Sequence, residues 1–265
     1  MTEATRIRDR IDTGPRFAEA DAVRLNRLFR GTDTIEMLET VLKEGMAGDV
    51  GIVSSFGAES AVLLHLVSQV DPGVPVLFLE TGKHFPETLA YRDLLIERLG
   101  LKDLRNLTPD AEELAKKDES GLRWSYDPDG CCDIRKVKPL AKALLGLDAS
   151  ITGRKAFQAS TRATLPRFEI DTTDEQGRLK INPLIDWSPE RIAAYIEEHD
   201  LPPHPLVAEG YPSIGCMPCT SKVAPGEDPR SGRWRGWDKT ECGIHVAHHT
   251  PDHTEQVAPE FDPGL

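Results

Sequence analysis

Two spacings of hydrophobic residues alternate along the first 200 residues. Between residues 33 and 46 the spacing is that of an amphipathic helix that Asp33 can cap, and the apolar stripe consists of Ile35, Leu38, Val41 and Leu42. Short continuous apolar runs are typical of buried strands, and they predict strands at 51–53, 75–79, 104–107, 149–152 and 179–184. Further helices are expected around 62–67, at 88–99 and at 189–198, the last opened by Ser188.

The alternation of strands and helices predicts an α/β fold, Rossmann-like, with a mainly parallel sheet flanked by helices. Residues 1–30 are expected to form an N-terminal helical arm, and residues 31–200 the α/β domain. After residue 200 the periodicity stops and prolines become frequent, so residues 201–265 are expected to form an irregular C-terminal segment. Ligands of parallel sheets bind beyond the carboxyl ends of the strands, so we expect a ligand at the loops that follow 51–53 and 75–79.

Composition excludes several classes of protein. The chain has 265 residues, with 44 acidic and 32 basic side chains and a net charge of −12, which disfavours nucleic-acid binding. No run of about 18 apolar residues exists, so we expect no membrane span. The first 30 residues are mixed in charge and lack the apolar core of a signal peptide. We therefore expect a cytoplasmic protein.

The loop after the first predicted strand suits an anion. Small and hydroxyl residues there can turn backbone N–H groups inward, and the next helix adds its N-terminal dipole; the residues are Ser54, Ser55, Phe56, Gly57 and Ser60. The loop lacks the Gly-Lys-Ser/Thr ending of a Walker A motif. An ordinary turn between strand and helix is the alternative.

Positive charge is concentrated in two places within this acidic chain. Residues 133–167 contain eight Lys and Arg against two Asp, a local balance of +6. A second cluster holds Arg230, Arg233, Arg235 and Lys239. Such clusters favour a focused field for a small anion. The alternative is solvated helix faces, which we prefer for Lys138 and Lys142.

Four of the five cysteines form two pairs, Cys131 with Cys132 and Cys216 with Cys219. Four thiolates can hold a [4Fe–4S] cluster or a structural zinc ion, and a CxxC pair can also be a redox disulfide. The fifth, Cys242, lies three residues before His245 and downstream of basic residues, which makes it a candidate nucleophile. A tail cysteine without a role is the alternative.

Together these segments resemble the assimilatory sulfonucleotide reductases. The matching segments occur in order between residues 50 and 245: SSFGAES (54–60), LETGKHFPET (79–88), CCDIRKVKPL (131–140), ITGRKAFQASTRATLP (151–166), INPLIDW (181–187), GCMPCT (215–220) and ECGIH (241–245). The resemblance implies an adenine nucleotide alpha hydrolase-like fold. In that family both cysteine pairs mark the branch that carries one [4Fe–4S] cluster per chain and uses adenosine 5′-phosphosulfate (APS).

The resemblance also implies a mechanism. The Cys242 thiolate would attack the sulfur of APS, AMP would leave, and thioredoxin or glutaredoxin would release sulfite from the S-sulfocysteine. The implied substrate contacts, besides the 54–60 loop, are Glu80, Thr81, Gly82, Lys136, Arg162, Arg230, Arg233 and His245. Ala156 departs from the family pattern, which bears on the roles of Lys155 and Arg162. A homo-oligomer is plausible for the family, and the C-terminal segment is expected to close Cys242 over the nucleotide.

Three other readings compete with this one. A reductase that prefers the 3′-phosphorylated substrate PAPS is the nearest. An ATP-pyrophosphatase-type adenylating enzyme would share the fold, but it would normally have an SGGxDS-like loop and no use for ECGIH. A zinc-binding module would leave Cys242 inert. The histidines His248, His249 and His253 are expected to be solvated rather than metal-bound.

Overall fold

The protein was analysed as a computed structural model that describes residues 16–158, 162–174 and 176–245. Within these residues, six strands form one sheet in the order β3-β2-β1-β4-β6-β5. Neighbouring strands are parallel except β5, which runs antiparallel to β6. The strands are β1 (Val50–Ser54), β2 (Val76–Leu79), β3 (Leu104–Leu107), β4 (Ala149–Thr152), β5 (Phe168–Ile170) and β6 (Leu179–Ile181).

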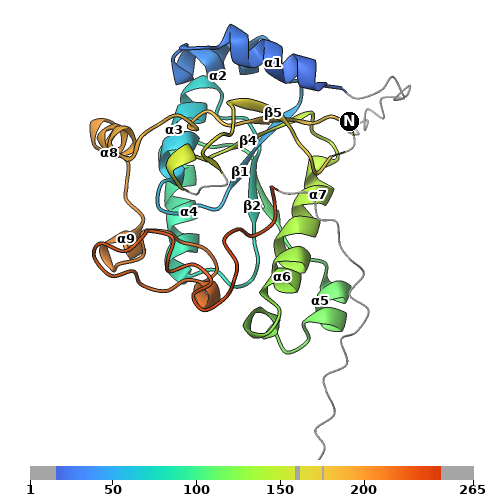
Figure 1. Cartoon of the computed structure of the whole chain (residues 1–265), viewed down its shortest axis with the longest axis vertical. Coiled ribbons are helices and arrows are strands. Elements are labelled where there is room, and N and C mark those ends of the chain that lie inside the picture. The colour runs from blue at the N-terminus through green and yellow to red at the C-terminus, as the bar shows by residue number, and fades with distance from the viewer. Residues whose placement is uncertain (1–15, 159–161, 175, 246–265) are drawn as a thin grey trace, which may run out of the picture.

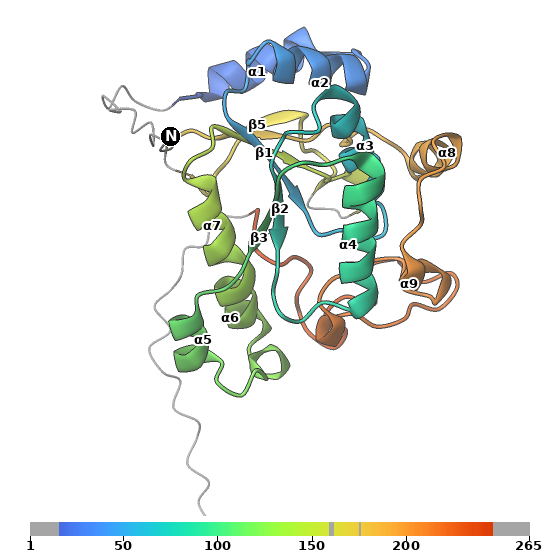
Figure 2. The same ribbon diagram turned by 180° about the vertical axis from the view of Figure 1, so that it is seen from behind.

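Helices cover both faces of this sheet (Figures 1 and 2). One face carries α3 (Ser60–Val70), with α2 (Thr34–Lys43), α4 (Pro86–Leu99) and α8 (Pro189–Glu198) packed against it. The other face carries α7 (Lys138–Leu144), which contacts β2 and β3. Because both faces are covered, β2 and β4 are buried along their whole length, which explains the uninterrupted apolar sequence of β2.

The antiparallel edge of the sheet is closed by α1 (Glu19–Leu28). The Asn26 side chain donates to the carbonyl of Phe168 at 2.6 Å and accepts from the Phe168 amide at 3.1 Å. These bonds satisfy backbone groups that an edge strand otherwise leaves unpaired. Ala22 and Leu25 of α1 belong to the main hydrophobic core.

A broken helix leads from the cysteine pair toward α7. After α5 (Ala111–Lys117) and the 3₁₀ turn η1 (Arg123–Ser125), helix α6 (Pro128–Cys132) continues into the π-helical turn Asp133–Val137 and then α7. π-turns inside helices occur frequently at functional sites.

The C-terminal segment lies beyond the carboxyl ends of the parallel strands (Figure 1, orange to red). Its described part has only α9 (Pro205–Ala208) and the 3₁₀ turn η5 (Met217–Cys219). It packs through Leu206 and Ile214 onto Phe85, next to the start of α4.

Most elements predicted from the apolar pattern are confirmed, including the caps Asp33 and Ser188, which accept from backbone amides of α2 and α8. The strand predicted at 179–184 ends at Ile181, because Pro183 cannot donate to the ladder. The sequence reading did not predict β5, α5, α6 or α9. The divisions at residues 30 and 200 stay predictions. In the described chain, no helix is long and apolar enough to cross a membrane.

Candidate active site

The loop after β1 and the segment after β4 meet where the strand order reverses. From β1 the chain builds outward to β2 and β3, whereas β4 lies on the other side of β1. This switch point is where open α/β sheets bind ligands. The Ser54–Ser60 loop is held here by a strained residue: Phe56 is fully buried with φ of 48° and packs edge-on against Phe78. Such strain is concentrated at functional sites.

An ion pair between buried Lys155 and half-buried Glu59 joins the two segments. The Lys155 ammonium lies 2.9 Å from the Glu59 carboxylate, and the Gln158 side chain donates to the same carboxylate at 3.0 Å. Burial lowers the pKa of Lys155, and Glu59 partly opposes that shift. Arg154 is engaged elsewhere, with Glu169 and the Asn182 side chain. The two cations that follow β4, Arg154 and Lys155, are therefore paired within the protein rather than free in solvent.

The two cysteine pairs line one cavity, although more than 80 residues separate them. Its other lining residues include Trp124, Arg135, Lys136 and Trp234. All four thiols are free. Among the residues described, no group of three or more His, Cys, Asp and Glu side chains could hold a single metal ion.

The four thiols differ in acidity. Burial raises the pKa of Cys131 to about 11 and that of Cys132 to about 12, and it also raises the pKa of Cys219. For Cys216, burial is outweighed by Lys136, by a hydrogen bond from Thr81 and by Arg233, so its pKa is lowered. The Thr81 hydroxyl lies 3.4 Å from the Cys216 sulfur. Of these four thiols, Cys216 is therefore the one that most readily forms a thiolate.

The loop after β2 supports this cavity. The Arg135 guanidinium donates to the Thr81 carbonyl at 2.7 Å and pairs with buried Asp118 at 2.6 Å. Thr81 itself is fully buried, whereas Gly82 is exposed. Glu80 accepts from the Gly82 amide at 3.0 Å and faces Arg92. Thus, of the predicted contacts in this loop, Thr81 faces the cysteines, and Glu80 stabilises the turn.

Cys242 lies next to the cysteine cavity. It is close enough to contribute to the pKa shifts of Cys132 and Lys136. Burial lowers the pKa of Lys136, but attraction to the negative charge that Cys216, Cys242 and Cys132 would carry when deprotonated outweighs burial and raises it. Ile244 packs against a hydrophobic cluster on β2 and α7, and Figures 1 and 2 show this end of the chain running between those elements.

Arginines surround the residues before Cys242. The Glu241 carboxylate accepts from Arg162 at 3.0 and 2.9 Å, and Arg230 lies 3.5 Å away. Arg233 stacks on the Trp234 ring at 4.5 Å. In the described structure the buried Nε of Arg233 and the indole nitrogen of Trp234 have no hydrogen-bond partner. Arg162 and Arg230 are thus paired with Glu241, and the positive field expected from the sequence stays a prediction.

His245 lies in the same C-terminal segment as Cys242 and Ile244. Burial and the nearby cations Arg154, Lys180 and Arg162 hold its pKa well below the usual range. It is therefore neutral at physiological pH and can donate or accept a hydrogen bond. The tail histidines at 248, 249 and 253 lie outside the described residues.

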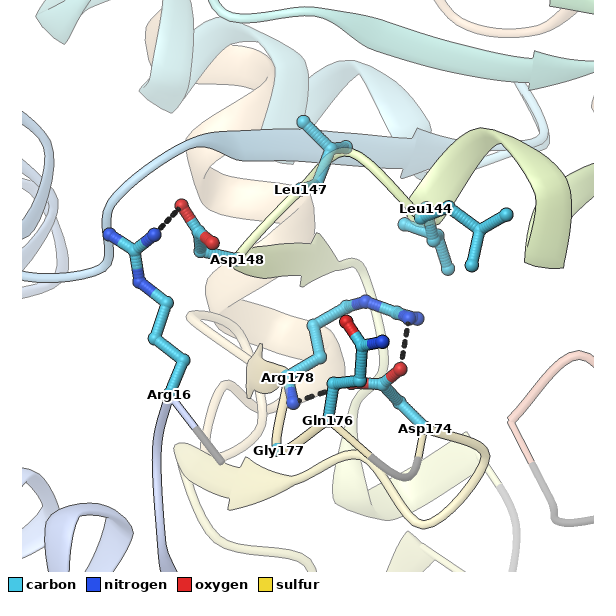
Figure 3. Close-up of a pocket in the computed structure, with 9 residues that line it drawn as sticks. Arg16, Leu144, Leu147, Asp148, Asp174, Gln176, Gly177 and Arg178 are labelled. Atoms are coloured by element: carbon cyan, nitrogen blue, oxygen red, sulfur yellow. Dashed lines mark hydrogen bonds and ion pairs between the residues drawn. The ribbon is translucent and has the colours of Figure 1, made fainter. Parts of the chain in front are cut away.

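A second pocket lies away from this site, before the first residues of β4 and β6 (Figure 3). Its charged side chains pair with one another, Arg16 with Asp148 and Arg178 with Asp174. These pairs leave the pocket without a strong net charge.

Sequence reasoning missed several residues of the site. Glu59, Gln158 and Glu241 are polar residues of the kind usually found on the surface, and only their partners reveal a role. Trp234, with φ of 46°, gave no sequence signal beyond its basic neighbours.

Comparison with known proteins adds independent findings. Residues 50–222 match the family described as "Phosphoadenosine phosphosulfate reductase domain". A Mesorhizobium japonicum protein named adenosine 5′-phosphosulfate reductase is 46% identical, over 93% of this chain and 96% of its own. One of that name from Mycolicibacterium smegmatis is 45% identical, over 77% and 85%.

Solved structures agree with the predicted fold class. The phosphoadenylyl-sulfate (PAPS) reductase of Candida auris superposes with a TM-score of 0.65 at 28% identity, over 79% of this chain and all of that one. Candida glabrata FMN adenylyltransferase superposes with a TM-score of 0.51 at 13% identity, over 84% of each chain, which indicates a shared fold only.

Proposed function

The chain belongs to the phosphoadenosine phosphosulfate reductase family, and we propose that it reduces APS to sulfite and AMP in sulfate assimilation and cysteine biosynthesis. The curated relatives carry that name and match this chain over most of their length. Within the site, the observation that supports the proposal most is that Cys242 directly follows Glu241, whose carboxylate contacts Arg162 and Arg230. A thiolate nucleophile and an anionic substrate both need such cations.

The chemical step uses Cys242 as nucleophile. Its thiolate attacks the sulfur of APS, a sulfur–sulfur bond forms, and the bond from that sulfur to the bridging phosphate oxygen breaks. AMP leaves with the bonding electron pair, and Cys242 becomes S-sulfocysteine. Lys136 and Arg230 offset the repulsion between the thiolate and the phosphosulfate.

The second step needs a dithiol, which we infer to be thioredoxin or glutaredoxin in the cytoplasm. One thiolate attacks the Cys242 sulfur and releases sulfite as a mixed disulfide forms. The second thiol of the reductant then resolves this disulfide and restores the Cys242 thiol. The reductant supplies both electrons and becomes a disulfide.

We infer that the cysteine cavity holds one [4Fe–4S] cluster. Its cysteines would be Cys131, Cys132, Cys216 and Cys219. Four free thiols around one cavity fit this group, because the cysteines of a cubane bind separate irons and need not converge on one ion. When bound, the cluster would supply structural support and an electrostatic field rather than the electrons of the reaction.

The nucleotide is expected to occupy the switch point. The Ser54–Ser60 loop and the Glu80–Gly82 turn would bind AMP, and Arg233 and His245 would face the phosphosulfate. We also propose that the protein forms a homo-oligomer, which light scattering would test.

Sulfite release tests the function directly. Protein purified without oxygen is given thioredoxin and either APS or PAPS, and its iron and acid-labile sulfide are measured. We expect sulfite from APS and about four irons and four sulfides per chain. Sulfite from PAPS alone would favour the other branch of the family. A colourless zinc protein without activity would contradict the proposal.

A further inference from the structure

The residue before the catalytic cysteine holds a docked position of its own. Each nitrogen of the Arg162 guanidinium donates to a protein oxygen: Nε and Nη2 to the two oxygens of Glu241, at 3.0 and 2.9 Å, and Nη1 to Gln158 at 2.7 Å. The Arg162 side chain is 12% exposed and that of Glu241 26%. A bidentate ion pair whose side chains are this little exposed to solvent stabilises the structure more than a surface ion pair does.

Resting on the function proposed above, we propose that Glu241 is a positioning residue that docks Cys242 into the site, with Arg162 as its docking partner rather than a substrate contact. The contact joins segments 79 positions apart in the chain. Arg230 supports it by donating to the Thr240 carbonyl at 2.7 Å. Cys242 therefore follows two residues that are both fixed to arginines.

The segment that leads to Cys242 makes a second ion pair. Lys239 pairs with Asp129 at the start of the helix that carries the first cysteine pair. It also lies over the Trp234 ring at 5.5 Å. Both ion pairs involve residues just before Cys242, Lys239 and Glu241, and they attach the segment that leads to Cys242 to two other parts of the protein.

The docking contact reaches the nucleotide loop. Gln158, which accepts from Arg162, donates to Glu59 at 3.0 Å, and Glu59 precedes α3 at the end of the Ser54–Ser60 loop. The docking contact and this loop are therefore joined by a continuous set of hydrogen bonds.

The test uses Glu241→Gln, Arg162→Gln and the double variant of the holoprotein. The rate of Cys242 alkylation by iodoacetamide is followed by peptide mass spectrometry, and S-sulfocysteine formation is followed in a single turnover with APS and no reductant. We expect each single variant to be alkylated about tenfold faster and to form S-sulfocysteine about tenfold more slowly, as loss of a charge-assisted hydrogen bond implies. The double variant should lose no more than either single one.

AMP affinity separates docking from substrate binding. We expect it to be unchanged in Glu241→Gln and Arg162→Gln. Weaker AMP binding in Arg162→Gln, with additive effects in the double variant, would overturn the assignment, as would wild-type alkylation rates in both. Glu227→Gln is the matched control, because Glu227 pairs with Arg235 on the same segment and is exposed. If the wild type forms no S-sulfocysteine, the proposed function fails, but alkylation still decides whether the tail is docked.

Discussion

Arg135 and Asp118 form a buried ion pair, 2.6 Å long, beside the loop that follows β2. The same guanidinium donates to the Thr81 carbonyl, and Thr81 in turn faces Cys216. Arg135 lies in the π-turn between the first cysteine pair and Lys136. The pair therefore ties the turn after β2 to the helix of the cysteines.

Removing one partner of this pair should destabilise the protein. We expect Asp118→Asn to lower the free energy of unfolding by about 3 kcal/mol, because the Arg135 charge stays buried without its carboxylate. Asp186→Asn is the control, since Asp186 is 53% exposed in its pair with Arg167 and should cost about 0.5 kcal/mol or less. Urea denaturation measures both; equal losses in the two variants would contradict the role of the buried pair.

The backbone after Cys242 requires glycine. Gly243 has φ of 89°, where a side chain costs about 1–2 kcal/mol. We expect Gly243→Ala to slow sulfite release severalfold, because the strain is relieved most easily by moving the tail. The control is Gly146→Ala, where a methyl group would meet nothing within 4 Å. Steady-state assays compare the two, and a Gly243→Ala enzyme as active as the control would rule out a fixed tail.

His204 should make the fold sensitive to acid. Burial lowers its pKa from 6.5 to about 4, and its Nδ1 accepts from the Leu206 amide while Nε2 bonds to Thr88. Because the unfolded chain binds this proton more readily, stability falls as pH drops from about 6.5 toward 4, by up to about 3 kcal/mol.

The His204→Asn variant isolates this effect. Asparagine can still accept from the Leu206 amide but does not titrate, so its stability should fall less between pH 7 and pH 4.5 than that of the wild type. Thermal melts at a series of pH values measure the difference. Parallel curves for the two proteins would show that His204 does not account for the acid sensitivity.

The apolar pattern predicted β2, β4 and β6 because these strands are buried along their whole length, whereas β3 at the edge of the sheet is only partly buried. It missed β5, whose three residues include Glu169 and whose residue Phe168 bonds through its backbone to the Asn26 side chain, 142 positions away. The π-turn at Asp133–Val137 likewise has no periodicity of its own. These elements are fixed by tertiary contacts that a local pattern does not contain.

The site was predictable where residue type limits the chemistry. Thiols and arginines near a strand end narrow the choice of ligand, and the two cysteine pairs do share one cavity. Glu59 and Glu241 were not predictable, because a carboxylate in a loop is usually solvated. Only the fold reveals that Lys155 and Arg162, 96 and 79 positions away, neutralise them. The roles of the individual site residues stay proposals.

The central claim is that Cys242 carries the sulfo group. The most direct measurement is peptide mass spectrometry after incubation of the holoprotein with APS and no reductant. We predict one added SO₃ group on the Cys242 peptide, lost with release of sulfite when thioredoxin is added, and no adduct in Cys242→Ser. An adduct on another cysteine, or sulfite release by Cys242→Ser at the wild-type rate, would contradict the account.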